Sequence, residues 1–447
     1  MAFDRRVPRA DSSRDLLRVL GLAFGVAIGV GTMVGGGILR APGSVIDQLP
    51  SPTLALLLWG LAGLHALLGA NVIAEVMTAL PKSGGLFVPA EAAFGRAGGL
   101  FIGWTDWLTQ IAAIAALSIA SGEFMALILP QLSGYQGIVG AAISLALYII
   151  NLAGVREGSA LQIAGSSLKV AFLLGLAVAV FFVPAAGAAP AAAPFALSAQ
   201  PITFWGVVIA YQLITGVYSG WPNPAYFPEE DKHPGKNIPR ALFTSVLTVA
   251  ALYLLVNLAL LYSLPLERLR ASDLPMAAAI SELFGPLSVK IVASAAVVIV
   301  LSCNNANIMV GSRILYGLAR KGLFPSAAQR VNRGGTPDVA LLLTALVSIS
   351  LTLTGSFELV FLMMGALVLL PLVVAEAALF RLRKIAPDLP RPYRAIGYPW
   401  LPGLVLTLDL MLFALFIIAD WKSGLSILAA VAICVPLGWA MRNAAPR

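Results

Sequence analysis

Residues 30–38 read Val30-Gly31-Thr32-Met33-Val34-Gly35-Gly36-Gly37-Ile38 and lie inside the first long apolar segment of the chain. A helix in lipid must pair its backbone N–H and C=O groups internally, because hydrocarbon offers them no partners. Three consecutive glycines favour an unwound turn, since glycine loses the most conformational freedom in a helix. Such a turn is tolerated where it faces protein or a wet cavity, as in helices that are broken around a ligand. Close helix packing through small residues is the alternative that this stretch alone leaves open.

The composition is that of a polytopic membrane protein. Of the 447 residues, 59% are hydrophobic and 11% are charged, whereas soluble domains carry about 25% charged residues. The formal net charge is +8, which in so apolar a chain is typical of basic cytoplasmic loops rather than of nucleic-acid binding. Cys303 and Cys434 both lie in apolar runs, so we expect no disulfide framework and no metal site.

At about 20 apolar residues per span, the sequence predicts about twelve membrane-spanning helices. The predicted spans are 19–46, 53–80, 98–130, 135–153, 159–184, 201–227, 238–264, 286–318, 337–355, 357–383, 399–419 and 423–441. Residues 1–18 are polar and have no evident cleavage site, which predicts a cytoplasmic N-terminal tail and a retained first span. Lys and Arg concentrate in the loops on the side of this tail, so we expect both termini in the cytoplasm of a multi-pass protein of the cell inner (plasma) membrane.

The sixth segment contains a second run of helix breakers, Gly216-Val217-Tyr218-Ser219-Gly220-Trp221-Pro222-Asn223-Pro224. Its two prolines remove helix donors and clash with the preceding turn. Interruptions in the first and sixth segments indicate two inverted repeats of five helices each, with the breaks antiparallel at the midplane. We expect the repeats to cover residues 19–184 and 201–385, and residues 399–441 to supply two further helices.

Paired breaks of this kind could hold a zwitterion. An unwound turn exposes N–H groups at the start of one half-helix and carbonyl groups at the end of the other. The N–H end suits a carboxylate and the carbonyl end suits an ammonium group. Glycine at 35–37 lets a carboxylate approach the backbone closely. A polyamine needs no anion site, so the pattern favours amino acids over amines.

Lys169 lies about ten residues in from the start of the fifth predicted span. An ammonium group at that depth is costly and marks a functional site by default. It could exchange a proton or stand in the place of a bound cation. Snorkelling toward the inner membrane interface is the alternative.

Other ionisable residues within the predicted spans are weaker signals. For Glu75, Glu123 and Glu376 we expect structural pairing rather than proton transfer. His65 has no visible partner in the sequence, and we expect a satisfied buried histidine. Arg40 follows the glycine break closely; steering an anionic group, pairing with Asp47 and snorkelling are all left open.

Five ordered motifs resemble those of the amino acid–polyamine–organocation superfamily of permeases, over nearly the whole chain. They are Gly31–Ile38, Ala74–Gly85, Pro228–Ala241, Gly311–Pro325, and Arg391–Arg394 together with Gly397–Pro399. The resemblance implies an all-α, leucine-transporter-like fold. In that fold ten core helices form a 5+5 inverted repeat, with discontinuous helices 1 and 6, and two more helices follow.

The resemblance also implies roles for individual residues. Gly36 and Gly37 would receive the substrate carboxylate, and carbonyls at Met33, Gly216 and Ser219 the amine. The remaining substrate-binding positions beside the breaks are Thr32, Gly35, Tyr218, Gly220 and Trp221. Lys169 matches a helix-5 lysine that in many members takes the place of a sodium ion and couples transport to protons or to exchange, and Ser302 is expected near it. Many members carry an aromatic gate where this chain has Gly216, which leaves substrate size open.

These features predict a secondary active transporter of amino acids that works by alternating access, either proton-coupled or as an exchanger. An amine or polyamine antiporter is the alternative within this class, and a non-transporting receptor or channel is the alternative outside it. Enzyme activity is not expected, because the sequence shows no nucleophile–base set and no phosphate-binding loop. We expect no cofactor and no nucleic acid. The expected partners are an amino acid, the lipid bilayer and, where transport is coupled to them, protons, in a monomer or homodimer.

Overall fold

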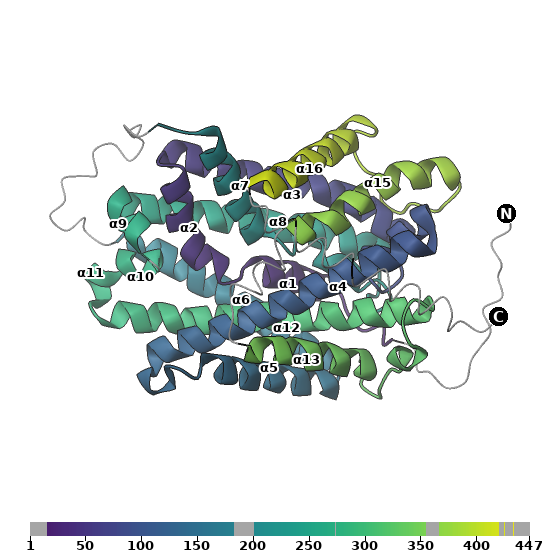
Figure 1. The fold of residues 1–447 in the computed structure, drawn as a ribbon, viewed down its shortest axis with the longest axis horizontal. Coiled ribbons are helices and arrows are strands. Elements are labelled where there is room, and N and C mark those ends of the chain that lie inside the picture. The colour runs from purple at the N-terminus through teal and green to yellow at the C-terminus, as the bar shows by residue number, and fades with distance from the viewer. Residues whose placement is uncertain are drawn as a thin grey trace.

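The computed structural model describes residues 16–182, 201–272, 274–354 and 366–419, together with Gly424 and Ala432. Across these residues the chain is helical, and its long helices lie side by side in an elongated bundle (Figure 1). The described residues form no strand beyond one isolated bridge between Leu20 and Asp231.

The first predicted span is broken at the glycine run. Helix α1 (Leu22–Met33) ends at Val34, and helix α2 (Gly37–Gln48) begins after Gly36. The two helices are bent by 43° at this break. The predicted unwound turn is therefore confirmed.

The sixth predicted span is broken as well. Helix α7 (Phe204–Tyr218) begins with a cap, in which the Thr203 side chain accepts a hydrogen bond from the N–H of Gly206. It ends at Ser219, and only a short 3-10 helix, η2 (Asn223–Tyr226), continues the segment. The helix therefore ends within the run of glycine and proline residues that predicted the break.

The other predicted spans coincide with helices wherever the structure describes them. These helices are α3 (Pro52–Ala79), α4 (Phe87–Ile128), α5 (Gln136–Ala153), α6 (Val155–Val180), α8 (Pro234–Ser263), α12 (Leu287–Arg320), α13 (Asp338–Leu353), α15 (Leu369–Ile385) and α16 (Trp400–Ala419). Helix α4 starts earlier than predicted because a preceding helical stretch joins it across Gly95, whose φ of +80° is not helical. The predicted span 423–441, like the first residues of 357–383, falls outside the described residues, apart from Gly424 and Ala432.

Within the described residues, seven helices are long and apolar enough to cross a membrane, or eight if α1 and α2 form one span. Helices α7 and α13 are apolar but shorter, with 15 and 16 residues. The fold is therefore that of a polytopic helical membrane protein.

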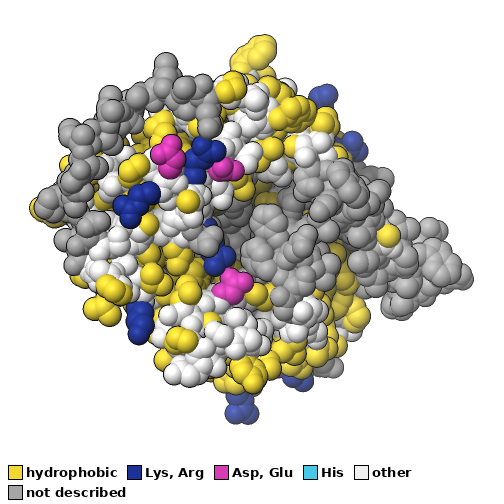
Figure 2. Space-filling view, turned by 60° about the vertical axis from the view of Figure 1, so that its left-hand side comes forward, with side chains coloured by type: hydrophobic (Ala, Val, Ile, Leu, Met, Phe, Trp, Pro, Cys, Tyr) yellow, Lys and Arg dark blue, Asp and Glu magenta, His cyan; other side chains and the backbone are white. Residues whose placement is uncertain are grey.

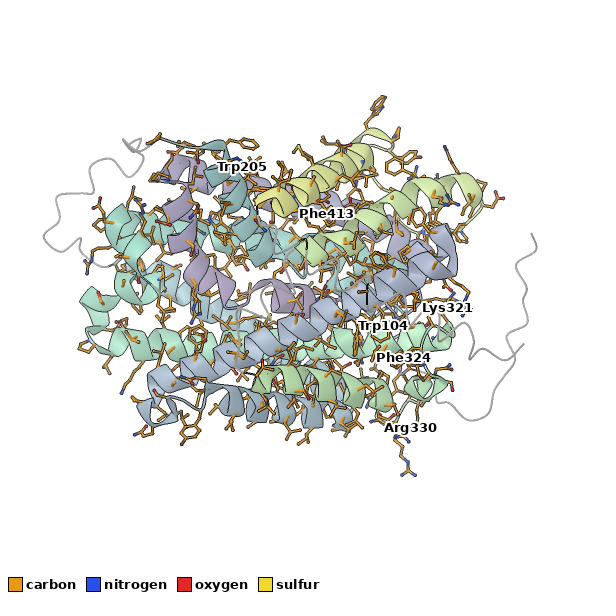
Figure 3. The ribbon with its side chains drawn as sticks, in the orientation of Figure 1. Trp104, Trp205, Lys321, Phe324, Arg330 and Phe413 are labelled. Atoms are coloured by element: carbon orange, nitrogen blue, oxygen red, sulfur yellow. The ribbon has the colours of Figure 1, made fainter. Side chains whose placement is uncertain are left out.

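The bundle has two distinct ends. The first, here named the α9 end, carries the short helices α9 (Leu266–Ala271), α10 (Pro275–Ala279) and α11 (Ser281–Phe284) at the left of Figure 1. The second, here named the η3 end, carries the 3-10 helix η3 (Ser326–Gln329) after α12 has run the length of the molecule. Figure 3 shows Trp205 toward the α9 end, and Lys321 and Arg330 at the η3 end.

Candidate functional site

The two helix breaks touch each other. The Thr32 hydroxyl lies 2.8 Å from the Gly220 carbonyl oxygen and 2.8 Å from that of Ile28 in its own helix. Gly220 has a φ of +94°, and a Cβ atom there would lie only 2.7 Å from the Cβ of Thr32. Glycine is therefore required at 220 by both its backbone conformation and its space.

Tyr253 of α8 joins the same two breaks from the side. Its hydroxyl donates to the Met33 carbonyl at 2.7 Å and lies 3.2 Å from the Val217 carbonyl. The ring is fully buried and packs edge-on against Tyr218 and Trp59, with centroid distances of 5.0 and 5.5 Å. Sequence reasoning missed Tyr253, because nothing in an apolar span shows which helix face meets the breaks.

Lys169 of α6 donates to the break in the first span. Its Nζ atom lies 2.6 Å from the Gly31 carbonyl oxygen and 2.8 Å from that of Val34. These carbonyls belong to the end of α1, where helical partners run out and the partial charge is negative. The side chain is 0% exposed, so its ammonium group is buried at the break rather than extended to the membrane surface.

A second set of polar contacts holds α1 beside this lysine. Gln162 and Ser166 both donate to the Ala27 carbonyl, at 3.2 and 2.7 Å. Ser302, expected near Lys169, lies 3.4 Å from each of these two side chains instead. Its neighbour Cys303 approaches the break, with its Sγ atom 3.4 Å from the Thr32 carbonyl oxygen. Sequence reasoning missed Cys303 at this position.

The start of α2 is open to an anion. The N–H groups of the first helical turn have no partner within their own helix, and the helix dipole is positive there. Gly36 is half-buried and Gly37 is exposed. A Cβ atom at Gly36 would find its nearest neighbours at ordinary distances, 3.6 Å for Val300 and 3.8 Å for Phe124. A carboxylate could therefore reach these backbone groups.

The carbonyl groups at the candidate site already accept hydrogen bonds from N–H and hydroxyl groups of the protein. The Met33 carbonyl accepts from the N–H of Gly35 at 2.8 Å as well as from Tyr253. The Gly216 carbonyl accepts from the N–H and the hydroxyl of Ser219, at 3.2 and 2.7 Å. Gly216 is exposed, and nothing lies within 4 Å of a Cβ atom built there. Free space therefore adjoins this half of the site.

The structure divides the predicted substrate-binding residues into two groups. Those with accessible surface are Gly36, Gly37, Gly216, Ser219 and Gly220, and those that are buried are Thr32, Met33, Gly35, Tyr218 and Trp221. The Tyr218 hydroxyl lies 3.2 Å from the Trp59 carbonyl oxygen of α3. Trp221 packs against Gly69, where a Cβ atom would come within 2.8 Å of the indole ring. Both aromatic rings thus pack against α3.

An ion pair lies near the start of α2, on the side of the α9 end. Arg40 and Glu123 are 3.2 Å apart, and the Arg40 guanidinium also lies 5.1 Å from the centre of the Phe124 ring. Figure 2 brings this end forward and shows a few charged side chains around a hollow in a largely apolar surface. Pairing of Arg40 with Asp47 is wrong as an expectation, because Asp47 pairs with Arg270 at 3.1 Å.

Toward the η3 end, a buried ion pair joins α12 to the loop after η2. Arg313 of α12 and Glu230 form a two-pronged ion pair, at 2.7 and 3.1 Å, and their side chains are 1% and 0% exposed. The Arg313 guanidinium also lies 5.2 Å from the centre of the Phe227 ring. Next to it, the backbone of Leu20 bonds to Glu230 and Lys232, at 2.9 and 3.0 Å. These hydrogen bonds join the residues just before α1 to the loop after η2.

Of the other ionisable residues in the predicted spans, Glu75 and His65 have partners, whereas neither carboxyl oxygen of Glu376 has a hydrogen-bond partner among the described residues, contrary to the pairing expected for it. Glu75 binds Arg383 at 2.6 Å and Arg391 at 3.3 Å, as expected for structural pairing. His65 is largely buried and its imidazole is satisfied, as expected, by partners that the sequence did not show. Its Nε2 atom lies 3.1 Å from Asp409, and its Nδ1 atom 3.2 Å from the Tyr211 hydroxyl. Asp409 escaped notice because it lies in the eleventh span, far from His65 in sequence.

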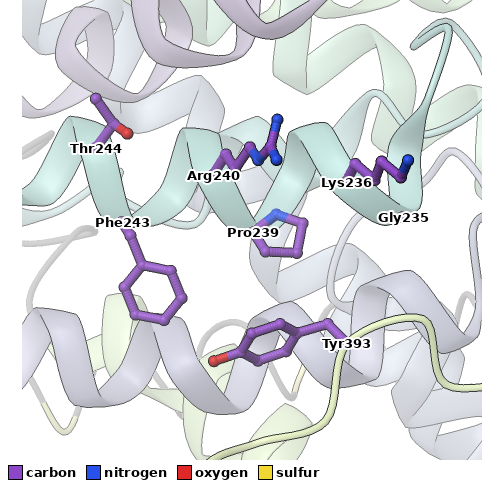
Figure 4. Close-up of a pocket in the computed structure, with 7 residues that line it drawn as sticks. All are labelled: Gly235, Lys236, Pro239, Arg240, Phe243, Thr244 and Tyr393. Atoms are coloured by element: carbon purple, nitrogen blue, oxygen red, sulfur yellow. The ribbon is translucent and has the colours of Figure 1, made fainter.

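A cavity of about 390 Å³ lies elsewhere, beside the start of α8. Its lining consists of Gly235, Lys236, Pro239, Arg240, Phe243, Thr244 and Tyr393. Figure 4 shows Lys236 and Arg240 pointing away from Tyr393. The cavity contains no residue of either break, so we do not assign substrate binding to it. Within the described parts of the chain, no cluster of His, Cys, Asp or Glu is arranged to hold a metal ion.

Two interrupted helices that meet at their breaks define a class, the multi-pass membrane proteins that carry solutes on broken helices. Residues 15–439 match the family model for amino acid permeases, and the chain belongs to that family. It is a family of transporters, not of enzymes.

Three relatives show the range of this similarity. The serine/threonine exchanger SteT of Bacillus subtilis is 27% identical over 423 residues, which cover 93% of this chain and 95% of the relative. The branched-chain amino acid permease BcaP of the same organism is 25% identical, over 93% of this chain and 90% of its own. The human large neutral amino acids transporter small subunit 2 is 27% identical, over 85% and 72%.

Proposed function

We propose that this protein is a secondary transporter that moves neutral amino acids across the cell membrane by alternating access. The observation that carries the proposal is the junction of the two breaks, where Gly36 and Gly37, which have accessible surface, lie beside helix ends that present carbonyls. Backbone groups of both signs can hold a zwitterion without a charged side chain in contact. The matched relatives, which carry amino acids by name, support this substrate class.

In this proposal the substrate carboxylate binds at the start of α2. The substrate amine binds the carbonyls of Met33, Gly216 and Ser219, and on binding it competes with Tyr253 and with the N–H groups of Gly35 and Ser219. The substrate side chain occupies the free space beside Gly216. A neutral side chain fits best, because Arg40 and Glu123 near the start of α2 neutralise each other and the Lys169 ammonium is engaged by the Gly31 and Val34 carbonyls.

The proposed direction of access follows from the two ends. Basic side chains concentrate at the η3 end, in the loops that hold Lys82, Arg156, Lys236, Arg330 and Arg394, which is typical of a cytoplasmic face. We therefore assign the α9 end to the outside and both termini to the cytoplasm of the inner (plasma) membrane. The exposure of Gly37 and Gly216, together with the buried Arg313–Glu230 pair, supports the proposal of an outward-facing state. Inward opening would separate that pair.

We further infer an inverted repeat of five plus five helices, because α1–α2 and α7–η2 are interrupted at corresponding places. Lys169 is the proposed coupling residue, since its ammonium group holds the carbonyls that shape the first break. Loss of its proton, or movement of α6, would release those carbonyls. Either event would couple substrate transport at the breaks to proton movement or to obligatory exchange.

The test is uptake by purified protein in liposomes. Vesicles loaded with an unlabelled neutral amino acid should take up the labelled form, whereas vesicles loaded with putrescine should not. Uptake of labelled putrescine together with no uptake of any amino acid would favour the amine antiporter instead. The absence of any uptake, with substrate binding retained, would favour a non-transporting receptor.

A further inference from the structure

Three ionisable side chains from three helices meet inside the bundle, away from the breaks. They are His65 of α3, Glu376 of α15 and Asp409 of α16. Glu376 is 0% exposed and Asp409 is 3% exposed, and the two carboxyl groups interact electrostatically. His65 lies 3.1 Å from Asp409, and Tyr211 of α7 lies against the other nitrogen of the imidazole ring.

The charges of this cluster do not balance if both carboxyl groups are ionised. Histidine supplies at most one positive charge against two negative ones. Neither oxygen of Glu376 has a hydrogen-bond partner among the described residues. An ionised carboxylate that is buried without a partner is very costly, and two neighbouring carboxylates do not both ionise readily. The stable form of the cluster therefore contains a proton on the carboxyl pair.

The other ionisable groups on the helices packed around Glu376 are engaged elsewhere in the described structure, apart from Lys384 of α15, which is exposed. On α4, Glu91 pairs with Lys321, Arg96 bonds to the Gly322 carbonyl, Asp106 accepts from Tyr226, and Glu123 pairs with Arg40. On α3 and α15, Glu75 and Arg383 pair with each other, and Arg381 lies over the Phe94 ring. The groups that face the carboxyl pair are thus His65 and, through it, Tyr211.

We propose that His65, Glu376 and Asp409 form a proton-binding site within the membrane, separate from Lys169. One proton is shared by the two carboxyl groups. Transfer of this proton to His65 leaves two carboxylates beside an imidazolium, so the net charge of the cluster stays at −1. The imidazolium gives up the proton to water only when water also reaches the two carboxylates that remain. No group other than these three changes its protonation.

The site is positioned to respond to the broken sixth span. Tyr211, which contacts His65, lies on α7 five residues before Gly216. On the opposite side, α3 carries Trp59, whose carbonyl lies by the Tyr218 hydroxyl, six residues before His65. A shift of α7 relative to α3 would therefore change the contact of Tyr211 with His65 and with it the proton affinity of the cluster. This linkage to substrate rests on the proposed transport function, whereas the proton site itself does not.

Infrared spectroscopy of the full-length protein in lipid tests the proton site without any substrate. At neutral pH the difference between the wild-type and Glu376→Gln spectra should contain the C=O stretching band of a protonated carboxylic acid, which the wild type has and Glu376→Gln lacks. Glu157→Gln, which changes an exposed carboxyl group at the start of α6, is the matched control and should keep the band. A band that is the same in Glu376→Gln and in the wild type overturns the proposal. If Glu376→Gln does not fold, Asp409→Asn should shift the frequency of the remaining band, and an unshifted band contradicts the shared proton.

Calorimetry tests the linkage. Amino acid binding should take up or release protons, measured as a dependence of the binding enthalpy on the ionisation enthalpy of the buffer. Glu376→Gln should reduce that proton count while still binding the amino acid, and Glu157→Gln should leave it unchanged. A proton count that Glu376→Gln does not alter overturns the linkage. Failure of any amino acid to bind would contradict the proposed function but leave the infrared result intact.

Discussion

Replacement of Lys169 by methionine tests the role of its ammonium group in the first break. The change removes two charge-assisted hydrogen bonds, of 2.6 and 2.8 Å, and leaves the side-chain volume nearly filled. Hydrogen bonds to charged groups contribute about 1.5–3 kcal/mol each, so about 3–6 kcal/mol of interaction at the break is lost. Removal of a buried charge offsets much of this in the free energy of unfolding, so the protein should still fold and insert.

Substrate affinity should fall much more than stability, because the carbonyls of Gly31 and Val34 lose the donor that orients them. If about 1.4–2.8 kcal/mol of the loss acts on the substrate-bound state, Kd rises about 10- to 100-fold. Equilibrium binding of a labelled amino acid measures this, and uptake into liposomes at several pH values measures coupling. Leu168→Met, at a lipid-exposed neighbouring position, is the matched control. Wild-type affinity together with wild-type pH dependence in Lys169→Met would refute the assignment.

Three further changes probe other parts of the account. Gly216→Phe should exclude bulky amino acids before small ones in competition uptake, because open space surrounds this position; equal loss for all sizes would argue against a size filter. Arg313→Leu should lower the free energy of unfolding by about 3–5 kcal/mol, because it leaves Glu230 buried without its cation. The double change with Glu230→Leu should recover part of that loss, and no recovery would contradict the pairing argument. Gly317→Ala should cost about 1–3 kcal/mol by overpacking, because its Cβ would lie 2.6 Å from the Gly84 backbone; an unchanged melting temperature would be inconsistent with that approach.

The helix breaks could be predicted because glycine and proline act locally. The triple glycine and the Pro222–Pro224 pair disfavour a helix whatever surrounds them, and the structure interrupts both spans at these positions. The depth of Lys169 in the membrane could also be predicted, because the length of a span fixes how far a residue lies from either surface.

The partners of these residues could not be predicted, because they depend on how each helix is rotated about its axis. Spans that are apolar on every side carry no signal of the face that turns inward. Tyr253, Cys303 and Asp409 each reach their contacts across long sequence separations. The partner of Arg40 could not be predicted for the same reason. Asp47 was a candidate because it is near in sequence, whereas Arg40 pairs with Glu123 in the fold.

Binding of a labelled neutral amino acid to purified Gly36→Val tests the central claim most directly. Gly36 has a right-handed helical backbone and room for a Cβ atom, so valine should be accommodated while its methyl groups cover the N–H groups at the start of α2. Gly175→Val, at an exposed helical position with nothing within 4 Å of its Cβ, is the matched control. The account predicts that Gly36→Val weakens binding at least about 100-fold, or about 2.8 kcal/mol, and that Gly175→Val binds as the wild type does. Equal affinity in all three proteins would contradict a carboxylate site at the first helix break.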